Sequence, residues 1–201
     1  MDRPLRMILL IEMVSSFFVA MVAPFWVVYA KMALGLTPYD WGAAMLTSGL
    51  VGILTAFPMG LLVDRLRPKK MILFGLSISS ICILLYPFSG GTWGVFSILS
   101  LLSLSNSMMM PAFSTLIANK IPRSRRGRLF SILGERGIQI SFGNFWGGGF
   151  LLFPPAATGA LLGGHIYELN PTYPWIIFSA AMALSLLLTH IFIKEPRETY
   201  Y

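Results

Sequence analysis

Six long apolar stretches, separated by short polar segments, dominate the chain. Their approximate limits are 7–33, 40–63, 71–88, 93–118, 129–164 and 173–193. Each stretch is long enough to cross the hydrocarbon core of a bilayer, which takes about 20 helical residues. The joins are short and rich in Gly, Pro, Asn and Thr, as turns are. We therefore predict a single all-α membrane domain, a bundle of six transmembrane helices.

Composition excludes a single water-soluble domain. Hydrophobic residues make up 56% of the 201 residues and charged residues only 11%, whereas a soluble domain carries roughly 25% charged residues. The formal net charge of +7 would suggest a nucleic-acid partner for a soluble protein. Here the basic residues lie in short segments between apolar stretches. We therefore expect the lipid bilayer, and not a nucleic acid, to be the partner of this chain. Cys82 is the single cysteine and nothing near it suggests a metal site or a cofactor.

The first apolar stretch begins like a signal peptide but is longer than one. Arg3 and Arg6 precede it, as in a positively charged n-region. The stretch continues as far as Tyr29, and Glu12 interrupts it early. We therefore expect this segment to remain in the protein as the first helix.

The distribution of Lys and Arg predicts the orientation in the membrane. If the N-terminus is cytoplasmic, Lys31 is the one basic residue expected outside, and Arg136 lies inside the fifth stretch. The remaining thirteen fall on the cytoplasmic side, where basic residues concentrate. We therefore predict a multi-pass protein of the cell membrane with both termini cytoplasmic. An aromatic belt is expected near the outer ends, formed by Trp41, Trp93, Tyr167, Tyr173 and Trp175.

The densest charge near the middle of the chain lies in the turn between the second and third stretches. A Gly is followed after three residues by Asp-Arg and then by a basic cluster. This pattern resembles motif A of the major facilitator superfamily, which lies between the second and third helices of each six-helix half. Arg67-Pro68 departs from the usual Gly-Arg, and a generic basic loop is the alternative. The matching positions, taken as a gating turn, are Gly60, Asp64, Arg65, Lys69 and Lys70.

The resemblance covers nearly the whole chain. Pro111-Ala112-Phe113, followed by Arg125-Arg126-Gly127, is similar to the end of a fourth or tenth helix in this family and its inner loop. The resemblance implies one six-helix half of a twelve-helix transporter, and the absence of Arg-x-x-Gln-Gly in the fourth stretch favours the C-terminal half. It implies transport of a small molecule by alternating access, with a second half, fused or as a second copy, as partner. The Asp of motif A typically contacts the opposite half.

A faint internal repeat relates the two halves of the sequence. Ala23-Pro24-Phe25 in the first stretch corresponds to Pro111-Ala112-Phe113 in the fourth, and each Pro lies about two thirds along its stretch. Two three-helix repeats of inverted topology would produce this correspondence, as in many transporters. Coincidence remains the alternative, because Pro is frequent in membrane helices.

Polar residues concentrate in the first, fourth and fifth stretches, whereas the third and sixth look lipid-facing. Intramembrane polar groups normally face a bundle interior or a water-filled cavity. The charged or coupling candidates are Glu12, Glu135 and Arg136. Glu12 either titrates, coupling transport to protons, or forms a static pair with Arg136. The cavity-lining candidates are Ser16, Trp26, Tyr29, Asn106, Met110, Gln139 and Asn144, whose aromatic and Met members favour a hydrophobic or weakly polar organic solute.

Close helix packing is expected in the fifth stretch. Gly159 and Gly163 form a small-xxx-small pair, which lets helix backbones approach each other. The Gly-Pro-x-x-Gly-Gly order of an antiporter motif is absent, so we assign these glycines to packing.

Two other functional classes have to be weighed. A non-transporting six-helix membrane partner, such as a degenerate half, fits the same helices. An intramembrane serine protease would need Ser77 and His190 within hydrogen-bond reach, but Ser77 lies in the wrong helix for the rhomboid type. We expect no enzymatic activity.

Overall fold

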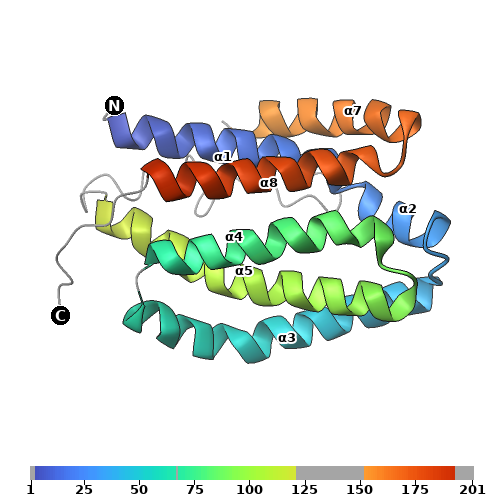
Figure 1. Cartoon of the computed structure of the whole chain (residues 1–201), viewed down its shortest axis with the longest axis horizontal. Helices are drawn as coiled ribbons and strands as arrows, with labels where there is room; N and C mark the ends of the chain where they lie inside the picture. The colour runs from blue at the N-terminus through green and yellow to red at the C-terminus, as the bar shows by residue number, and fades with distance from the viewer. Residues whose placement is uncertain (1–2, 67, 121–151, 193–201) are drawn as a thin grey trace.

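The chain folds into a bundle of α-helices with roughly aligned axes (Figure 1). The computed structural model describes residues 3–66, 68–120 and 152–192. Its elements are α1 (Arg3–Val22), α2 (Phe25–Met32), α3 (Pro38–Arg65), α4 (Pro68–Leu85), the 3-10 turn η1 (Tyr86–Phe88), α5 (Thr92–Lys120), α7 (Phe153–Leu169) and α8 (Tyr173–Phe192). No strand occurs in these three ranges, so the predicted all-α class is confirmed.

Several helical segments could cross a membrane. Within the described ranges, five are long and apolar enough: Met13–Met32, Pro38–Val63, Pro68–Phe88, Thr92–Thr115 and Tyr173–Ile191. They fall in the first four predicted stretches and in the sixth. For the fifth stretch, α7 ends at Leu169, five residues beyond the predicted limit of 164, and residues 129–151 lie outside the described part.

The two ends of the bundle differ in chemistry. The end on the left of Figure 1 carries the turn between α3 and α4, with Lys69 and Lys70, and the last turn of α8. We call it the basic end. The opposite end carries α2, η1 and the start of α8, and we call it the aromatic end because of the side chains described below.

The first predicted helix, 7–33, is divided into α1 and α2 at Ala23-Pro24. Proline has no backbone N–H, so the carbonyl of Ala20 loses its helical donor and the ladder stops. The last regular bond runs from Ala23 N to Val19 O (2.9 Å). The sequence locates the proline but predicts one continuous helix, because proline in a membrane helix can also be accommodated by a kink.

Helix α3 begins with a reciprocal cap that explains its sharp start at the aromatic end. Thr37 Oγ1 accepts a hydrogen bond from Asp40 N (3.1 Å), and Asp40 Oδ2 accepts one from Thr37 N (3.0 Å). Pro38 occupies the first turn of the helix, where its missing N–H costs nothing. The capping box thus satisfies two donors that the helix cannot.

The helix pairs follow the pattern that two inverted three-helix repeats would give. The first repeat contains α1 with α2, then α3 and α4, and the second contains α5, α7 and α8. Helix α1 packs against α7 as α5 packs against α3, and α8 contacts α1 as α4 contacts α5. The remaining large contact joins α4 to α8, which are counterparts of each other. Corresponding helices run in opposite directions (Figure 1).

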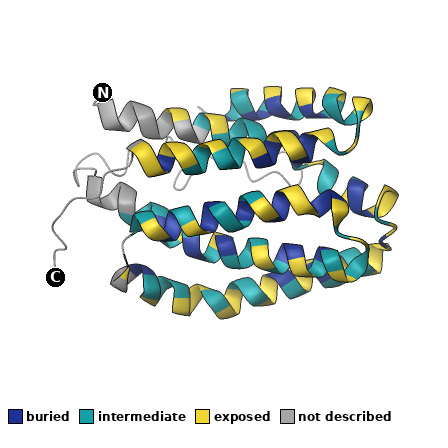
Figure 2. Cartoon of the chain, in the orientation of Figure 1, coloured by how far each residue is buried: buried dark blue, intermediate teal, exposed yellow. Residues whose placement is uncertain are grey.

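The expectation that the third and sixth stretches face lipid stays a prediction, but the third also has a large packed side. Among the described helices, 50% of the most apolar part of the α4 span is buried, which is the largest buried share of the five spans. The buried share of the α3 span is 11%. Figure 2 shows buried residues along the length of α4, which contacts α5 and α8. Helix α4 does keep an exposed apolar stripe, with Phe74 at 62% and Ile81 at 58% exposure. It therefore belongs to the centre of the bundle and also borders its surface.

Candidate functional site

The basic turn predicted as a gating element lies between α3 and α4, at the basic end. Gly60 has open space around the position of a Cβ among the described atoms. Asp64 and Arg65 belong to the last turn of α3, and their side chains are outside the described part. The turn is closed by a hydrogen bond from Leu66 N to Leu62 O (2.8 Å). Its two lysines follow at the start of α4.

The two lysines of the turn lie in different environments. Lys69 is half-buried, and its Nζ donates a hydrogen bond to the backbone carbonyl of His190 in the last turn of α8 (2.7 Å). Lys70 is exposed. Adjacent helical residues point about 100° apart, which explains why one lysine reaches α8 and the next does not face it.

Two cavity candidates lie together on α5. Asn106 and Met110 are both exposed, Met110 at 56%. Because they are four residues apart, they occupy the same face of the helix. Neighbouring Ser105 and Ser107 instead point toward other helices, as their hydrogen bonds show. An exposed amide in the middle of an apolar helix is costly against lipid, so this face is the described surface best suited to a polar pathway.

Ser16, another cavity candidate, joins two helices. It is half-buried in α1, and its Oγ donates to the backbone carbonyl of Leu152, just before α7 (3.2 Å). Its hydroxyl therefore has an acceptor within the bundle.

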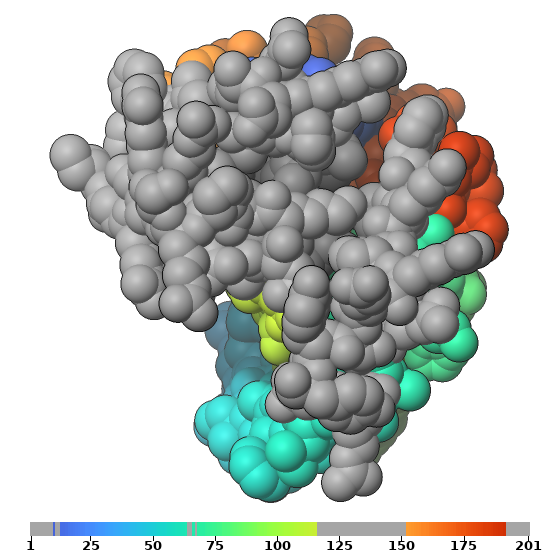
Figure 3. Space-filling view, turned by 90° about the vertical axis from the view of Figure 1, so that its left-hand side faces the viewer, coloured from blue at the N-terminus to red at the C-terminus, as the bar shows by residue number. Residues whose placement is uncertain are grey.

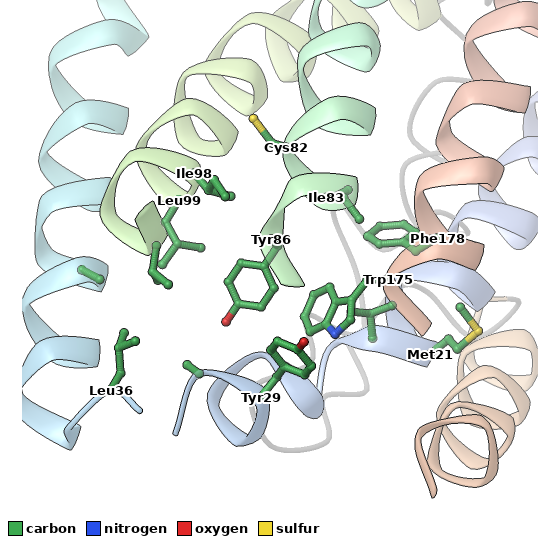
Figure 4. Close-up of a cluster of buried hydrophobic side chains, with 14 residues drawn as sticks. Met21, Tyr29, Leu36, Cys82, Ile83, Tyr86, Ile98, Leu99, Trp175 and Phe178 are labelled. Carbon is green, nitrogen blue, oxygen red and sulfur yellow. The ribbon is translucent and has the colours of Figure 1, made fainter. Parts of the chain in front are cut away.

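Trp26 and Tyr29 belong to an aromatic cluster at the aromatic end. Figure 4 shows Tyr29 close to Tyr86 and Trp175. Both rings contact Trp175 of α8, with centroid distances of 4.6 and 5.7 Å. Tyr29 is buried and donates its hydroxyl to the carbonyl of Pro87 (3.4 Å), while Tyr86 donates to the carbonyl of Trp26 (2.9 Å). These bonds join α2 to η1, the 3-10 turn that follows α4.

Trp175 corrects the predicted aromatic belt. Its side chain is 0% exposed and packs against Tyr86 at 4.5 Å, so it belongs to the core. Trp93 is 81% exposed, and its place in the belt stays a prediction. Both tryptophans lie near the start of a helix at the aromatic end. Trp175 is buried because the start of α8 packs against η1 and α2.

The small-xxx-small pair of α7 packs as predicted. Gly159 and Gly163 are buried, and a Cβ on either would overlap the backbone carbonyl oxygen of a residue in α1, Phe17 or Met21 respectively. The adjacent Gly164 has open space among the described atoms. The α1–α7 contact therefore depends on the absence of a side chain at two positions one turn apart.

Hydroxyl groups between helices were missed by sequence reasoning. Ser79 and Ser105 share a hydrogen bond of 2.7 Å between α4 and α5, and Ser105 also donates to the carbonyl of Gly75 (2.7 Å). Thr55 of α3 donates to Ser107 of α5 (3.1 Å). Ser and Thr hydroxyls in helices often donate to a backbone carbonyl of their own helix. The sequence therefore does not distinguish these hydroxyls from those that bond to another helix.

The remaining candidates lie outside the described residues. Glu12 belongs to α1, but its side chain is not described. Glu135, Arg136, Gln139 and Asn144 fall within residues 121–151. The proposed pair of Glu12 and Arg136 and the coupling role of Glu12 therefore stay predictions.

The protease alternative loses its geometric basis. Ser77 donates its hydroxyl to the carbonyl of Leu73 in its own helix (2.9 Å). His190 lies level with Lys69 along the bundle axis, because Lys69 Nζ donates a hydrogen bond to the His190 carbonyl. Since Ser77 lies eight residues further along α4, about 12 Å at 1.5 Å per residue, Ser77 and His190 do not form a nucleophile and base pair.

A helical bundle built from two inverted three-helix repeats is typical of membrane transporters. Residues 8–200 match the family model described as the Major Facilitator Superfamily, so the chain belongs to that family. The predicted family membership is thereby confirmed. The family indicates a membrane transporter.

Known relatives agree with this assignment. The chain is 24% identical over 201 residues to an uncharacterized MFS-type transporter, YhjO, of Bacillus subtilis (strain 168), covering 96% of this chain and 45% of the relative. It is 29% identical over 113 residues to the class G tetracycline resistance protein of Vibrio anguillarum, covering 53% and 27%. It is 31% identical over 83 residues to the multidrug resistance protein MdtG of Proteus mirabilis (strain HI4320), covering 41% and 21%. The chain thus spans less than half of the length of these relatives.

Proposed function

We propose that this chain is one six-helix half of a transporter that moves a small hydrophobic or weakly polar organic solute across the cell membrane by alternating access. The observation that carries the proposal is the family match over residues 8–200. In such a mechanism two bundles rock about a site between them. One half supplies one wall of the pathway, and a second half supplies the other.

The exposed face of α5 supports a pathway on this half. Asn106 offers an amide and Met110 an adaptable apolar surface, four residues apart and both exposed. Such a surface suits a solute with little charge and a few hydrogen-bonding groups. Exposed positions on α4 and α8 include apolar residues such as Leu84 and Leu187.

The names of two relatives support the same substrate class. One is a tetracycline resistance protein and another a multidrug resistance protein. For this chain we infer an organic solute as the substrate. Protons are the proposed coupling ion, with Glu12 as the acid that titrates or, alternatively, as a static partner of Arg136.

A second half is part of the proposal. The chain covers 45% of the length of YhjO, which is the share expected of one half. The partner is either fused to this half or a second copy related by two-fold symmetry. The proposal includes two cytoplasmic termini, an orientation that the distribution of Lys and Arg favours.

Thiol labelling tests the pathway directly. In a Cys82→Ala background, Asn106→Cys should react with a water-soluble maleimide in membranes, whereas Leu84→Cys and Leu187→Cys should not. An excess of a transported dye should slow the reaction at position 106. Equal inertness at all three positions would argue against a pathway on α5, and a non-transporting membrane partner would then be the better assignment.

A further inference from the structure

Helices α4 and α8 are joined by polar contacts as well as by apolar packing. Near the middle of the bundle Ser80 and Ser179 exchange hydrogen bonds: Ser80 Oγ donates to the Ser179 carbonyl (3.1 Å), and Ser179 Oγ donates to the Ser80 carbonyl (2.9 Å). At the aromatic end, Tyr86 packs against Trp175. In a bilayer, where lipid competes with apolar side chains, such polar contacts fix the relative position of two helices.

The contact at the basic end continues this line. Lys69 Nζ donates to the carbonyl of His190 (2.7 Å). Lys69 precedes Ser80 by 11 residues and His190 follows Ser179 by 11. The two pairs therefore share one antiparallel register, about 16 Å apart at 1.5 Å per residue. Figure 3 faces the basic end, where the described parts of α8 and α4 lie next to each other.

The contact joins a charged donor to a backbone acceptor. Hydrogen bonds in which the donor is ionised are shorter and stronger than those between neutral groups. The acceptor is the third residue from the end of the described part of α8, Tyr173–Phe192, and the lysine comes from the second position of α4, which begins at Pro68.

We propose that Lys69 is a positioning residue that ties the basic turn to the C-terminal end of α8, so that the turn and the end of α8 change position together. This inference rests on the proposed function, since it concerns the turn whose Asp64 is expected to contact a second half. Lys70, exposed and next in sequence, has no equivalent role in the proposal.

Hydrogen exchange measured on the membrane-embedded chain tests the coupling. Lys69→Gln should accelerate amide exchange about two- to fivefold, the factor that the net contribution of one hydrogen bond supplies, in the last described turn of α8 and also in the first turn of α4. Exchange in η1 and in the first turn of α8 should stay unchanged. Lys69→Arg should keep the exchange of the parent, because it keeps a cation in reach. Lys70→Gln is the matched control and should leave both ends unchanged.

Three outcomes of the exchange experiment would overturn the inference. The first is unchanged exchange in Lys69→Gln, the second an equal acceleration in Lys70→Gln, and the third an acceleration throughout α4 and α8, which would mean a general loss of stability. A parallel transport assay of the chain with its second half gives the functional result. There Lys69→Gln should slow transport, with Lys69→Arg restoring it, and an unchanged rate in Lys69→Gln would also overturn the inference. If the parent transports nothing, the proposed function fails, and the exchange data alone decide the coupling.

Discussion

Gly163 shows how one absent side chain sets the distance between two helices. A Cβ there would overlap the carbonyl oxygen of Met21, a backbone atom that cannot move alone. We predict that Gly163→Ala lowers the free energy of unfolding by about 1–3 kcal/mol, the usual cost of overpacking. Unfolding of the purified protein by increasing denaturant in mild detergent measures the change.

Gly164 supplies the control for this prediction. It is adjacent in α7, but open space surrounds the position of its Cβ among the described atoms. Gly164→Ala should be neutral or stabilise the protein by roughly 0.5–1 kcal/mol, the helix preference of Ala over Gly. Equal destabilisation by both changes would show that the α1–α7 contact does not depend on Gly163.

Sequence reasoning at the residue scale succeeded where spacing carries the information. The separation of Gly159 and Gly163 predicts a close helix contact, and the structure supplies its partner helix. It failed for Trp175, because burial depends on which helices surround the start of α8. It also missed the acceptor of Lys69, since a backbone carbonyl 121 residues away leaves no mark in the sequence.

At the scale of helix pairs, the α4–α8 contact gives a test of its polar bonds. Ser179→Ala removes the donor to the Ser80 carbonyl and leaves the Ser80 hydroxyl with its acceptor. We predict a loss of about 0.6 kcal/mol, the average for interhelical bonds in a membrane protein. Ser77→Ala is the control, because the Ser77 hydroxyl donates within its own helix. A larger effect at position 77 than at position 179 would contradict the assignment.

Hydropathy predicts the helices but not how they surround each other. The limits of α3, α4, α5 and α8 follow the apolar stretches closely, because spanning segments must be both apolar and long. The same criterion cannot tell lipid contact from helix contact, since lipid tails are as apolar as Leu. For this reason hydropathy does not reveal that α4 packs against both α5 and α8 while it keeps an exposed apolar stripe. The sequence likewise contains Pro24 but does not tell that α1 ends just before it.

At the scale of the whole molecule, the orientation in the membrane is open to a direct test. A reporter active outside the cytoplasm should be active when fused at Gly90, which lies in the turn after η1 at the aromatic end. The same reporter fused at Ser124 should be inactive. This outcome follows from the thirteen Lys and Arg residues placed on the cytoplasmic side. An inactive reporter at Gly90 would reverse the assigned orientation.

The last prediction is that this half does not transport without a second half. Alternating access needs two bundles, and the chain covers only 45% of the relative that it matches over its whole length. Reconstituted alone as a monomer it should move no dye across liposomes, and with a second half it should. Asp64, at the end of α3 on the basic end, is then expected to contact the positive N-terminal end of a helix in the second half. Asp64→Asn should change the transport rate about two- to fivefold, whereas Asp40→Asn, in the cap at the opposite end of α3, should affect mainly stability. A strict monomer that transports at the same rate with and without Asp64→Asn would refute both the need for a second half and the role of this carboxylate.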